Sequence, residues 1–233
     1  MLTWMVQNVG TTQTQRKGTI ATTGNRPAQG LQAYQQRVSQ EKRRLILEVA
    51  IGAFLANGYD TTTMDSIGDG AGVSYATLYK HFPGKEILFS EAMDHLFHQL
   101  FARWKDHTVP PELETGLREI ARAYNELVSD PNMIAAMRLV IAQVQCFPDI
   151  GLRLQRAKDL FSDVTDAWLT KRVEEGWLAI GDVQLARAEF IGMLGESLYF
   201  PRLMQIDYAI RNDDVERIIG SAVSTFLSRY RSR

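Results

Sequence analysis

The chain has 233 residues, 45% of them hydrophobic and 23% charged, with a formal net charge of −1. This length and composition are typical of a soluble globular protein of one or two domains with a sizeable core. No apolar run approaches the roughly 20 residues of a membrane span, so we expect no membrane partner. The first residues lack the basic cap and the long apolar core of a secretory signal.

Residues 1–38 are rich in Thr, Gln and Gly and poor in apolar side chains, which predicts a disordered arm. Basic residues gather in this arm and just after it, against a single acid, Glu41: they are Arg16, Lys17, Arg26, Arg37, Lys42, Arg43 and Arg44. This asymmetry favours a nucleic-acid-facing end on a near-neutral body. The arm either grips the DNA minor groove or is a passive tail or the product of a start codon placed too far upstream, and we favour the latter two interpretations.

Apolar residues recur at the helical period over residues 39–57, and Gly58 is placed to end that helix in a left-handed conformation. A short apolar run follows Thr63, whose hydroxyl can cap a helix N-terminus. Gly72 interrupts this run, and Ser74 begins another helix. Two short helices joined by a glycine-containing turn form a helix-turn-helix unit, which places its second helix in the DNA major groove. An ordinary helical hairpin is the alternative interpretation.

Taken as a string, this stretch resembles the DNA-binding domain of the TetR family of bacterial repressors. The resemblance rests on Thr63, on Ala-Gly-Val-Ser at residues 71–74, on Thr-Leu-Tyr-Lys-His-Phe at residues 77–82 and on Gly-Lys-Glu at residues 84–86. It covers residues 39–90 and leaves the arm outside.

The resemblance implies two groups of DNA contacts. Phosphates would be met by Thr63, Tyr79, Lys80 and Lys85, and by Lys42, Arg43 and Arg44 on the first helix. Base edges would be met by Ser74, Tyr75, Thr77 and His81. Because the second helix of the motif contains neither Arg nor Asn, we expect modest specificity from each half-site. Gly68 and Gly70 replace the better helix formers of the family, which predicts a helix-turn-helix unit that is mobile without DNA.

Beyond the motif, apolar periodicity predicts helices and no strands. A helix from Lys85 to about residue 106 links the motif to a body of further helices at about residues 112–129, 131–147, 148–176, 182–201 and 213–230. His95 and His98 are three residues apart, but no further ligand cluster supports a metal site. The single cysteine, Cys146, suits a reducing cytoplasm, and its helical, apolar surroundings predict a buried thiol.

Catalysis leaves no signature in the sequence. No glycine-rich phosphate loop, Gly-x-Ser-x-Gly or His-Glu-x-x-His motif is present, and the carboxylates are scattered near Lys and Arg. We therefore expect no enzymatic activity and no cofactor. A helical enzyme of another class would require carboxylates or histidines that converge in the body.

The last two helices carry wide apolar stripes, which would be core in a monomer. The resemblance implies instead that they form a four-helix bundle with a second copy of the chain. The expected dimer interface consists of Phe190, Leu194, Leu198, Ile219, Val223 and Phe226.

Aromatic and methionine side chains are frequent in the middle of the body, at the helical spacing of a core. The resemblance implies that some of them line a cavity for an unknown small-molecule inducer. The expected lining consists of Met93, Phe97, Phe101, Trp104, Met133, Met137, Phe161 and Trp168. Arg138, Gln143 and Gln145 are candidates for its polar groups.

Together these features predict an all-α protein. Its parts would be a disordered arm (1–38), an N-terminal three-helix helix-turn-helix DNA-binding domain (39–84) and a C-terminal helical ligand-binding and dimerisation domain (85–233). We expect a homodimeric cytoplasmic repressor that a small apolar or amphipathic ligand releases from a palindromic double-stranded DNA operator. The alternative is an activator, or a ligand-independent repressor controlled by a protein partner.

Overall fold

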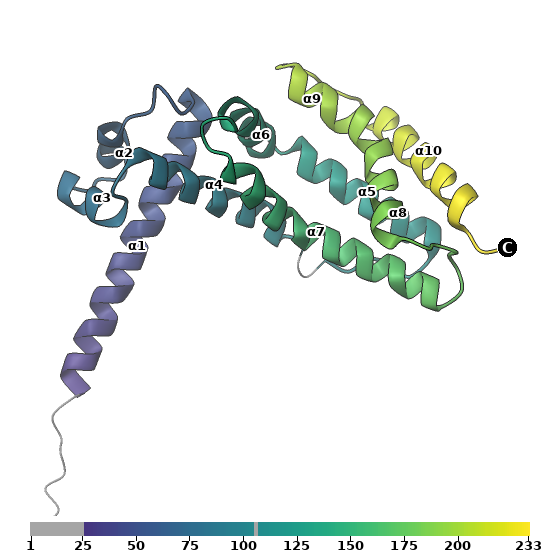
Figure 1. Ribbon diagram of the computed structural model, residues 1–233, viewed down its shortest axis with the longest axis horizontal. Helices are drawn as coiled ribbons and strands as arrows, with labels where there is room; N and C mark the ends of the chain where they lie inside the picture. Colours follow the sequence, from purple (N-terminus) through teal and green to yellow (C-terminus); the bar gives the residue numbers. More distant parts are fainter. Residues whose placement is uncertain (1–25, 105–106) are drawn as a thin grey trace, which may run out of the picture. The chain divides into compact units, whose positions relative to one another are not determined.

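The computed structural model describes residues 26–104 and 107–233. Over these ranges the regular secondary structure is helical apart from one bridging residue pair, Leu178 and Arg231. The expectation of an all-α fold is confirmed. The elements in chain order are α1 (Arg26–Asn57), α2 (Met64–Gly70), α3 (Tyr75–His81), α4 (Lys85–Ala102), α5 (Leu113–Ser129), α6 (Pro131–Gln143), α7 (Asp149–Glu174), α8 (Val183–Leu194), the π-helical turn η1 (Gly195–Tyr199), α9 (Phe200–Met204) and α10 (Asn212–Tyr230) (Figure 1).

Helix α1 begins at Arg26, well before the predicted start at residue 39. The prediction of disorder is therefore wrong for residues 26–38, while residues 1–25 lie outside the described residues. The reason is local: this segment is rich in Gln, Ala and Arg, which are good helix formers even where no apolar stripe marks a buried face. A boundary between Glu41 and Lys42 separates two units of the structure.

The second unit, from Lys42 onward, contains the three-helix head formed by the end of α1 with α2 and α3. Ile46, Ala50 and Phe54 point from α1 into its core, where Ile67 of α2 and Leu78 of α3 are also buried. Each of these side chains lies on the face that the apolar periodicity marks.

The glycines of the head have specific structural roles. Gly58 ends α1 with φ of 81° and Gly72 forms the turn after α2 with φ of 61°, a region that residues with a Cβ rarely adopt. In α2, a Cβ added at Gly70 would lie 2.9 Å from the Val49 side chain, and one at Gly68 would lie 3.4 Å from Leu78. Close packing against α1 therefore accounts for Gly70, whereas a Cβ at Gly68 would make an ordinary contact.

An aromatic cluster joins the head to the body. The ring of Tyr59 packs 4.9 Å from that of Phe89 on α4 and 4.9 Å from that of Phe147, which follows α6. Phe54 of α1 completes the cluster by an edge-on contact with Phe89 at 5.1 Å. Phe147, which is far from the head in the sequence, thereby contacts the head directly.

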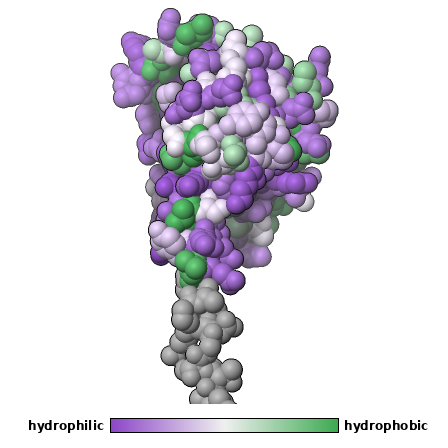
Figure 2. Space-filling view, turned by 90° about the vertical axis from the view of Figure 1, so that its left-hand side faces the viewer, coloured by the Kyte–Doolittle hydropathy of each residue, from purple (hydrophilic) through white to green (hydrophobic). Residues whose placement is uncertain are grey.

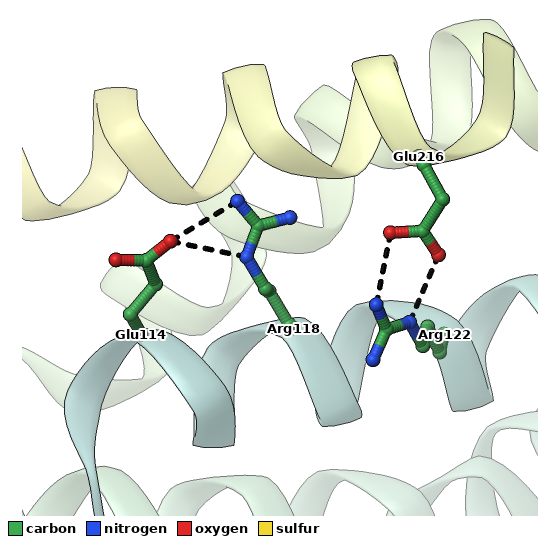
Figure 3. Close-up of polar contacts among 4 residues, drawn as sticks. All are labelled: Glu114, Arg118, Arg122 and Glu216. Atoms are coloured by element: carbon green, nitrogen blue, oxygen red, sulfur yellow. Dashed lines mark hydrogen bonds and ion pairs between the residues drawn. The ribbon is translucent and has the colours of Figure 1, made fainter. Parts of the chain in front are cut away.

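The body is built from α4 to α10. Helix α7 lies along α4, and α8 and α10 pack against each other and against α5 (Figure 1). Between α5 and α10, Arg122 donates two hydrogen bonds of 2.9 Å to Glu216, and Arg118 donates to Glu114 one helical turn away (Figure 3). None of the helices in the described ranges is long and apolar enough to cross a bilayer.

A corner at the end of α7 fixes the connection between α4 and α5. The Trp168 ring lies so close to Gly116 of α5 that a Cβ there would be 2.3 Å from it, and its indole N–H donates to the Pro110 carbonyl at 2.8 Å. Arg172 is 2% exposed, lies 5.1 Å from the Trp177 ring and pairs with Glu175 at 2.8 Å. These contacts hold α7 against the start of α5.

Two predicted helices differ from those of the structure. Helix α6 ends at Gln143 rather than near residue 147, and Cys146 lies in the following turn, exposed rather than buried. The predicted helix 182–201 is interrupted by η1, in which the Phe200 N–H donates to the Gly195 carbonyl five residues back. Pro201 explains the interruption, because proline lacks an N–H and its ring clashes with the carbonyl four residues before it in an α-helix.

Candidate DNA-binding face and ligand cavity

Two hydroxyl caps build the helix-turn-helix. Thr63 accepts a hydrogen bond from the Ser66 N–H at 3.2 Å, and the Ser66 hydroxyl accepts from the Thr63 N–H at 3.3 Å. This reciprocal capping box fixes the start of α2. Ser74 caps α3 in the same way by accepting from the Thr77 N–H at 3.3 Å, with the two hydroxyl oxygens 2.9 Å apart. The hydroxyls of Thr63 and Ser74 therefore position the helices first, whatever they contact in a complex.

Aromatic and basic side chains form the exposed face of α3. Tyr75 is 61% exposed, and its ring lies 4.2 Å from that of Tyr79 one turn later. A hydrogen bond with the Tyr75 side chain raises the pKa of Tyr79, so the Tyr79 phenol stays protonated. Lys80 is exposed beside them. Figure 2 views the side of the molecule where α2 and α3 lie and shows that hydrophilic residues predominate there.

The basic residues of α1 and α4 that were predicted to contact phosphates differ in whether they already have partners within the protein. Arg43 pairs with Glu91 of α4, and its guanidinium lies 4.9 Å from the Phe82 ring. Arg44 donates to Glu48 at 2.7 Å. Lys85 donates to the Asp60 carbonyl at 3.1 Å, whereas Lys42 is exposed and forms no ion pair within the described ranges. Arg43 thus links α1 to α4 through an ion pair.

The pKa of His81 reflects its burial and the positive charges around it. Burial first, and then the positive charges of Lys80, Arg43 and Lys42, lower the pKa of His81 below its usual value. The imidazole is therefore neutral at pH 7 in the free protein. The nearby cations make protonation of His81 unfavourable. An approaching phosphate would offset their charge and so favour protonation of His81.

A cavity of about 460 Å³ lies in the body between α4, α5, α6, α7 and α8. Of the predicted lining, Phe101, Met133, Met137 and Phe161 reach it. Its volume lies in the usual range for a small-molecule site, roughly 300–1,000 Å³. The cavity wall also contains Tyr124, Gln155, Lys158, Arg187 and Tyr199, which the sequence analysis missed.

The other four predicted cavity residues are core. Met93 and Phe97 are fully buried on α4. Trp104 packs edge-on against Phe161 at 4.6 Å and does not line the cavity. Trp168 packs on Gly116 instead. Arg138 also turns away from the cavity and donates to the carbonyls of Arg202, Leu203 and Gln205, where it caps the end of α9. Gln143 lines a different, open groove beside Tyr59, and Gln145 is exposed.

The predicted dimer residues face inward. All six lie between 0% and 2% exposed in one protomer, namely Phe190, Leu194, Leu198, Ile219, Val223 and Phe226. Phe190 and Phe226 pack against each other at 5.2 Å between α8 and α10. The apolar stripes that suggested an interface are buried in the core of the protomer. Other apolar side chains remain exposed on α9 and just after it, in particular Phe200, Met204 and Ile206.

No group of three or more His, Cys, Asp or Glu side chains suited to a metal occurs in the part of the chain that the structure describes. His95 instead lies 3.0 Å from the Gln99 amide. What remains is a turn-linked pair of capped helices with phenols and cations on their outer face, attached to a helical body with an apolar cavity. That combination defines a DNA-binding transcriptional regulator.

Comparison with known families gives the same class and a family. Residues 46–92 match the family described as "Bacterial regulatory proteins, tetR family", and residues 115–232 match the "AefR-like transcriptional repressor, C-terminal domain". The second match alone spans half of the chain. The chain belongs to the TetR family of transcriptional regulators, a family of regulators rather than enzymes.

Individual relatives agree with this assignment. Over 65 residues the chain is 38% identical to the transcriptional repressor KstR2 of Mycobacterium tuberculosis, a match that covers 28% of the chain and 32% of the relative. The match thus spans about one third of that relative's length. The fatty acid metabolism regulator protein of Bacillus subtilis is 24% identical over 158 residues, which cover 66% of the chain and 79% of the relative.

Solved structures share the fold over most of the chain. A putative TetR-family transcriptional regulator from Mesorhizobium loti is 27% identical to the chain, with a TM-score of 0.70. The similarity covers 83% of this chain and 98% of the Mesorhizobium loti chain. The flavonoid-responsive regulator FrrA is 26% identical with a TM-score of 0.68, covering 83% and 99%. Both similarities extend through the helical body as well as the head.

Proposed function

We propose that the protein is a homodimeric cytoplasmic repressor, released from a palindromic DNA operator when a small amphipathic ligand enters the cavity of its body. The single observation that carries this proposal is the cavity between α4 and α8 in a chain with a helix-turn-helix head. Relatives named as repressors, such as KstR2, and a neighbour named as flavonoid-responsive support the two halves of the proposal.

DNA binding would use the exposed face of α3. Tyr75, Thr77 and His81 would meet base edges, and Lys80 and Tyr79 would meet phosphates, while Ser74 and Thr63 add helix N-terminal N–H groups to the same surface. Hydroxyl and phenol groups discriminate bases weakly, so a second head is needed for a specific site. The boundaries of the DNA-binding domain (39–84) and of the body (85–233) are part of this proposal.

Dimerisation would use the exposed apolar surface of α8 to α10 rather than the stripes first expected. Phe200, Met204 and Ile206 are 51%, 66% and 87% exposed in one protomer, and Ile218 of α10 is half-buried. Surface of this kind on adjacent elements is costly to leave in water. A two-fold pairing of this face would bury it and place the two heads on one palindrome.

Release would follow from movement of α4. Phe101 near its end lines the cavity, and Lys85 at its start directly follows the turn after α3. Phe147 offers a second connection, since it follows α6 and packs on Tyr59 of the head. Two heads on one palindrome must stand roughly 34–36 Å apart, so a small tilt of α4 in each protomer is enough to lose the operator. A ligand needs to favour the released state by only a few kcal/mol.

The proposal is tested by selecting bound fragments from a random DNA pool and then screening small amphipathic compounds against the selected complex. We expect an enriched inverted repeat, and compounds that both raise the melting temperature and release DNA. The cavity variant Met137→Trp should mimic the ligand, while Ile141→Trp, on the exposed side of α6, serves as the control. Compounds that stabilise the protein without ever releasing DNA would favour control by a protein partner. Activation of a reporter by the bound protein would indicate an activator.

A further inference from the structure

The polar side chains around the body cavity share one property: none of them is a carboxylate. Lys158 of α7 and Arg187 of α8 bring positive charge to the wall, and Gln155 is neutral. Asp166 compensates Arg187 through a hydrogen bond of 2.6 Å, whereas Lys158 forms no ion pair with the residues that the structure describes. Lys158 is exposed at the edge of the cavity wall. Its charge has no partner among the described residues, which favours an anion over a cation at this edge.

Two phenols add hydrogen-bond donors to the same cavity. Burial raises the pKa of Tyr124 to about 12 and that of Tyr199 to about 12, so both phenols remain protonated at neutral pH. Neither hydroxyl forms a hydrogen bond with the described part of the chain, and both residues line the cavity. Each phenol therefore has its O–H free to donate to an oxygen acceptor bound in the cavity.

The backbone around these phenols is shaped for the same purpose. Tyr199 and Gly195 both belong to the π-helical turn η1 and both line the cavity. A Cβ at Gly195 would approach the Tyr124 hydroxyl to 3.2 Å, so the glycine leaves space for the phenol. Single π-helical turns inside helices occur often at functional sites, because they redirect a side chain that a regular helix would place elsewhere.

We propose that the ligand of this cavity is an amphipathic carboxylate, with Lys158 supplying the opposite charge and the phenols of Tyr124 and Tyr199 supplying hydrogen-bond donors. Its apolar part packs against Met133, Met137 and Phe161. This inference rests on the proposed ligand-controlled function and specifies the chemical class of the ligand.

The test compares three probes of one shape, 4-butylbenzoate, its methyl ester and 4-butylbenzylamine, by calorimetric titration of the full chain without DNA. We expect the carboxylate to bind about tenfold more tightly than the ester, as one charge-assisted hydrogen bond predicts, and the amine to bind weakest. Lys158→Met keeps the length of the side chain and should lower carboxylate affinity about tenfold while leaving the ester unchanged. Lys171→Met, at an exposed position of the same helix outside the cavity wall, is the matched control.

Tyr124→Phe and Tyr199→Phe remove one donor each and should weaken the carboxylate about fivefold without lowering the melting temperature. Equal or tighter binding of the ester or the amine would overturn the inference, as would unchanged affinity in Lys158→Met. The same conclusion follows if no carboxylate binds across a series of growing apolar size up to dodecanoate. Operator release is measured separately: carboxylates that bind without releasing DNA leave the ligand class intact and refute the proposed release.

Discussion

The proposed dimer face offers the sharpest test, because the sequence predicted an interface of residues that are buried in the protomer, whereas we propose an interface of exposed residues. Met204 and Ile206 are 66% and 87% exposed in the protomer, whereas Phe226 is 1% exposed. Replacing Phe226 by Asp would bury a charge in the protomer and unfold it, so that variant cannot report on dimerisation. The double variant Met204→Asp/Ile206→Asp leaves the core intact and changes only the exposed face.

The expected loss follows from the exposed fractions. Full burial of a Met or Ile side chain contributes about 1.5–3 kcal/mol, so burying the exposed parts of these two contributes about 3 kcal/mol per protomer and about 6 kcal/mol in a symmetric dimer. A loss of that size weakens dimerisation by about four orders of magnitude before the cost of the new charges is added.

The assay is sedimentation velocity at about 1 µM, a concentration at which a nanomolar dimer persists and the weakened one dissociates. Circular dichroism checks that the helices remain. Leu152→Asp is the matched control, since Leu152 is 60% exposed but lies on α7, outside the proposed face. A double variant that stays dimeric while the control behaves like the parent would refute the assignment of this face.

Four further predictions follow from the head and the body. Lys80→Ala should weaken binding to all DNA sequences alike and reduce the slope of log affinity against log salt by about one per head, and an unchanged slope would mean that Lys80 meets no phosphate. DNA affinity should rise as the pH falls from 7.5 toward 6, because phosphates raise the lowered pKa of His81 and the complex takes up a proton that the free protein does not; His81→Gln should abolish that dependence. Gly116→Ala should lower the free energy of unfolding by about 1–3 kcal/mol, because the new Cβ would overlap the Trp168 ring, and a thermal or urea melt of equal midpoint would contradict the packing described. Deleting residues 1–36 should leave the melting temperature of the remainder unchanged, since residues 31–37 are exposed, and a drop of several degrees would show that the segment packs.

The helix-turn-helix could be predicted almost completely from the sequence, because its determinants are local. Thr63 and Ser74 bond to N–H groups only three residues away, and Gly58 and Gly72 adopt positive φ at the positions where each preceding helix must end. Capping and glycine turns are decided by a few consecutive residues, so a single sequence carries them.

The limits of α1 and of the helix after Asp182 were harder to predict. Residues 26–38 lack an apolar stripe, and periodicity detects only helices that bury one face, so the first part of α1 was missed. The π-helical turn before Pro201 shifts the hydrogen-bonding pattern of the helix by one residue. The continuous apolar pattern of the sequence does not indicate this shift.

The cavity and the free face were decided by tertiary structure alone. Apolar periodicity marks the buried side of a helix but does not say whether a neighbouring helix of the same protomer or a second copy covers it, and here Phe190 and Phe226 cover each other. In the same way, Met93 and Met133 carry equal signals in the sequence, yet only Met133 reaches the cavity. Which side chains line a cavity depends on how five helices from distant parts of the chain pack together. A local sequence pattern contains no information about that packing.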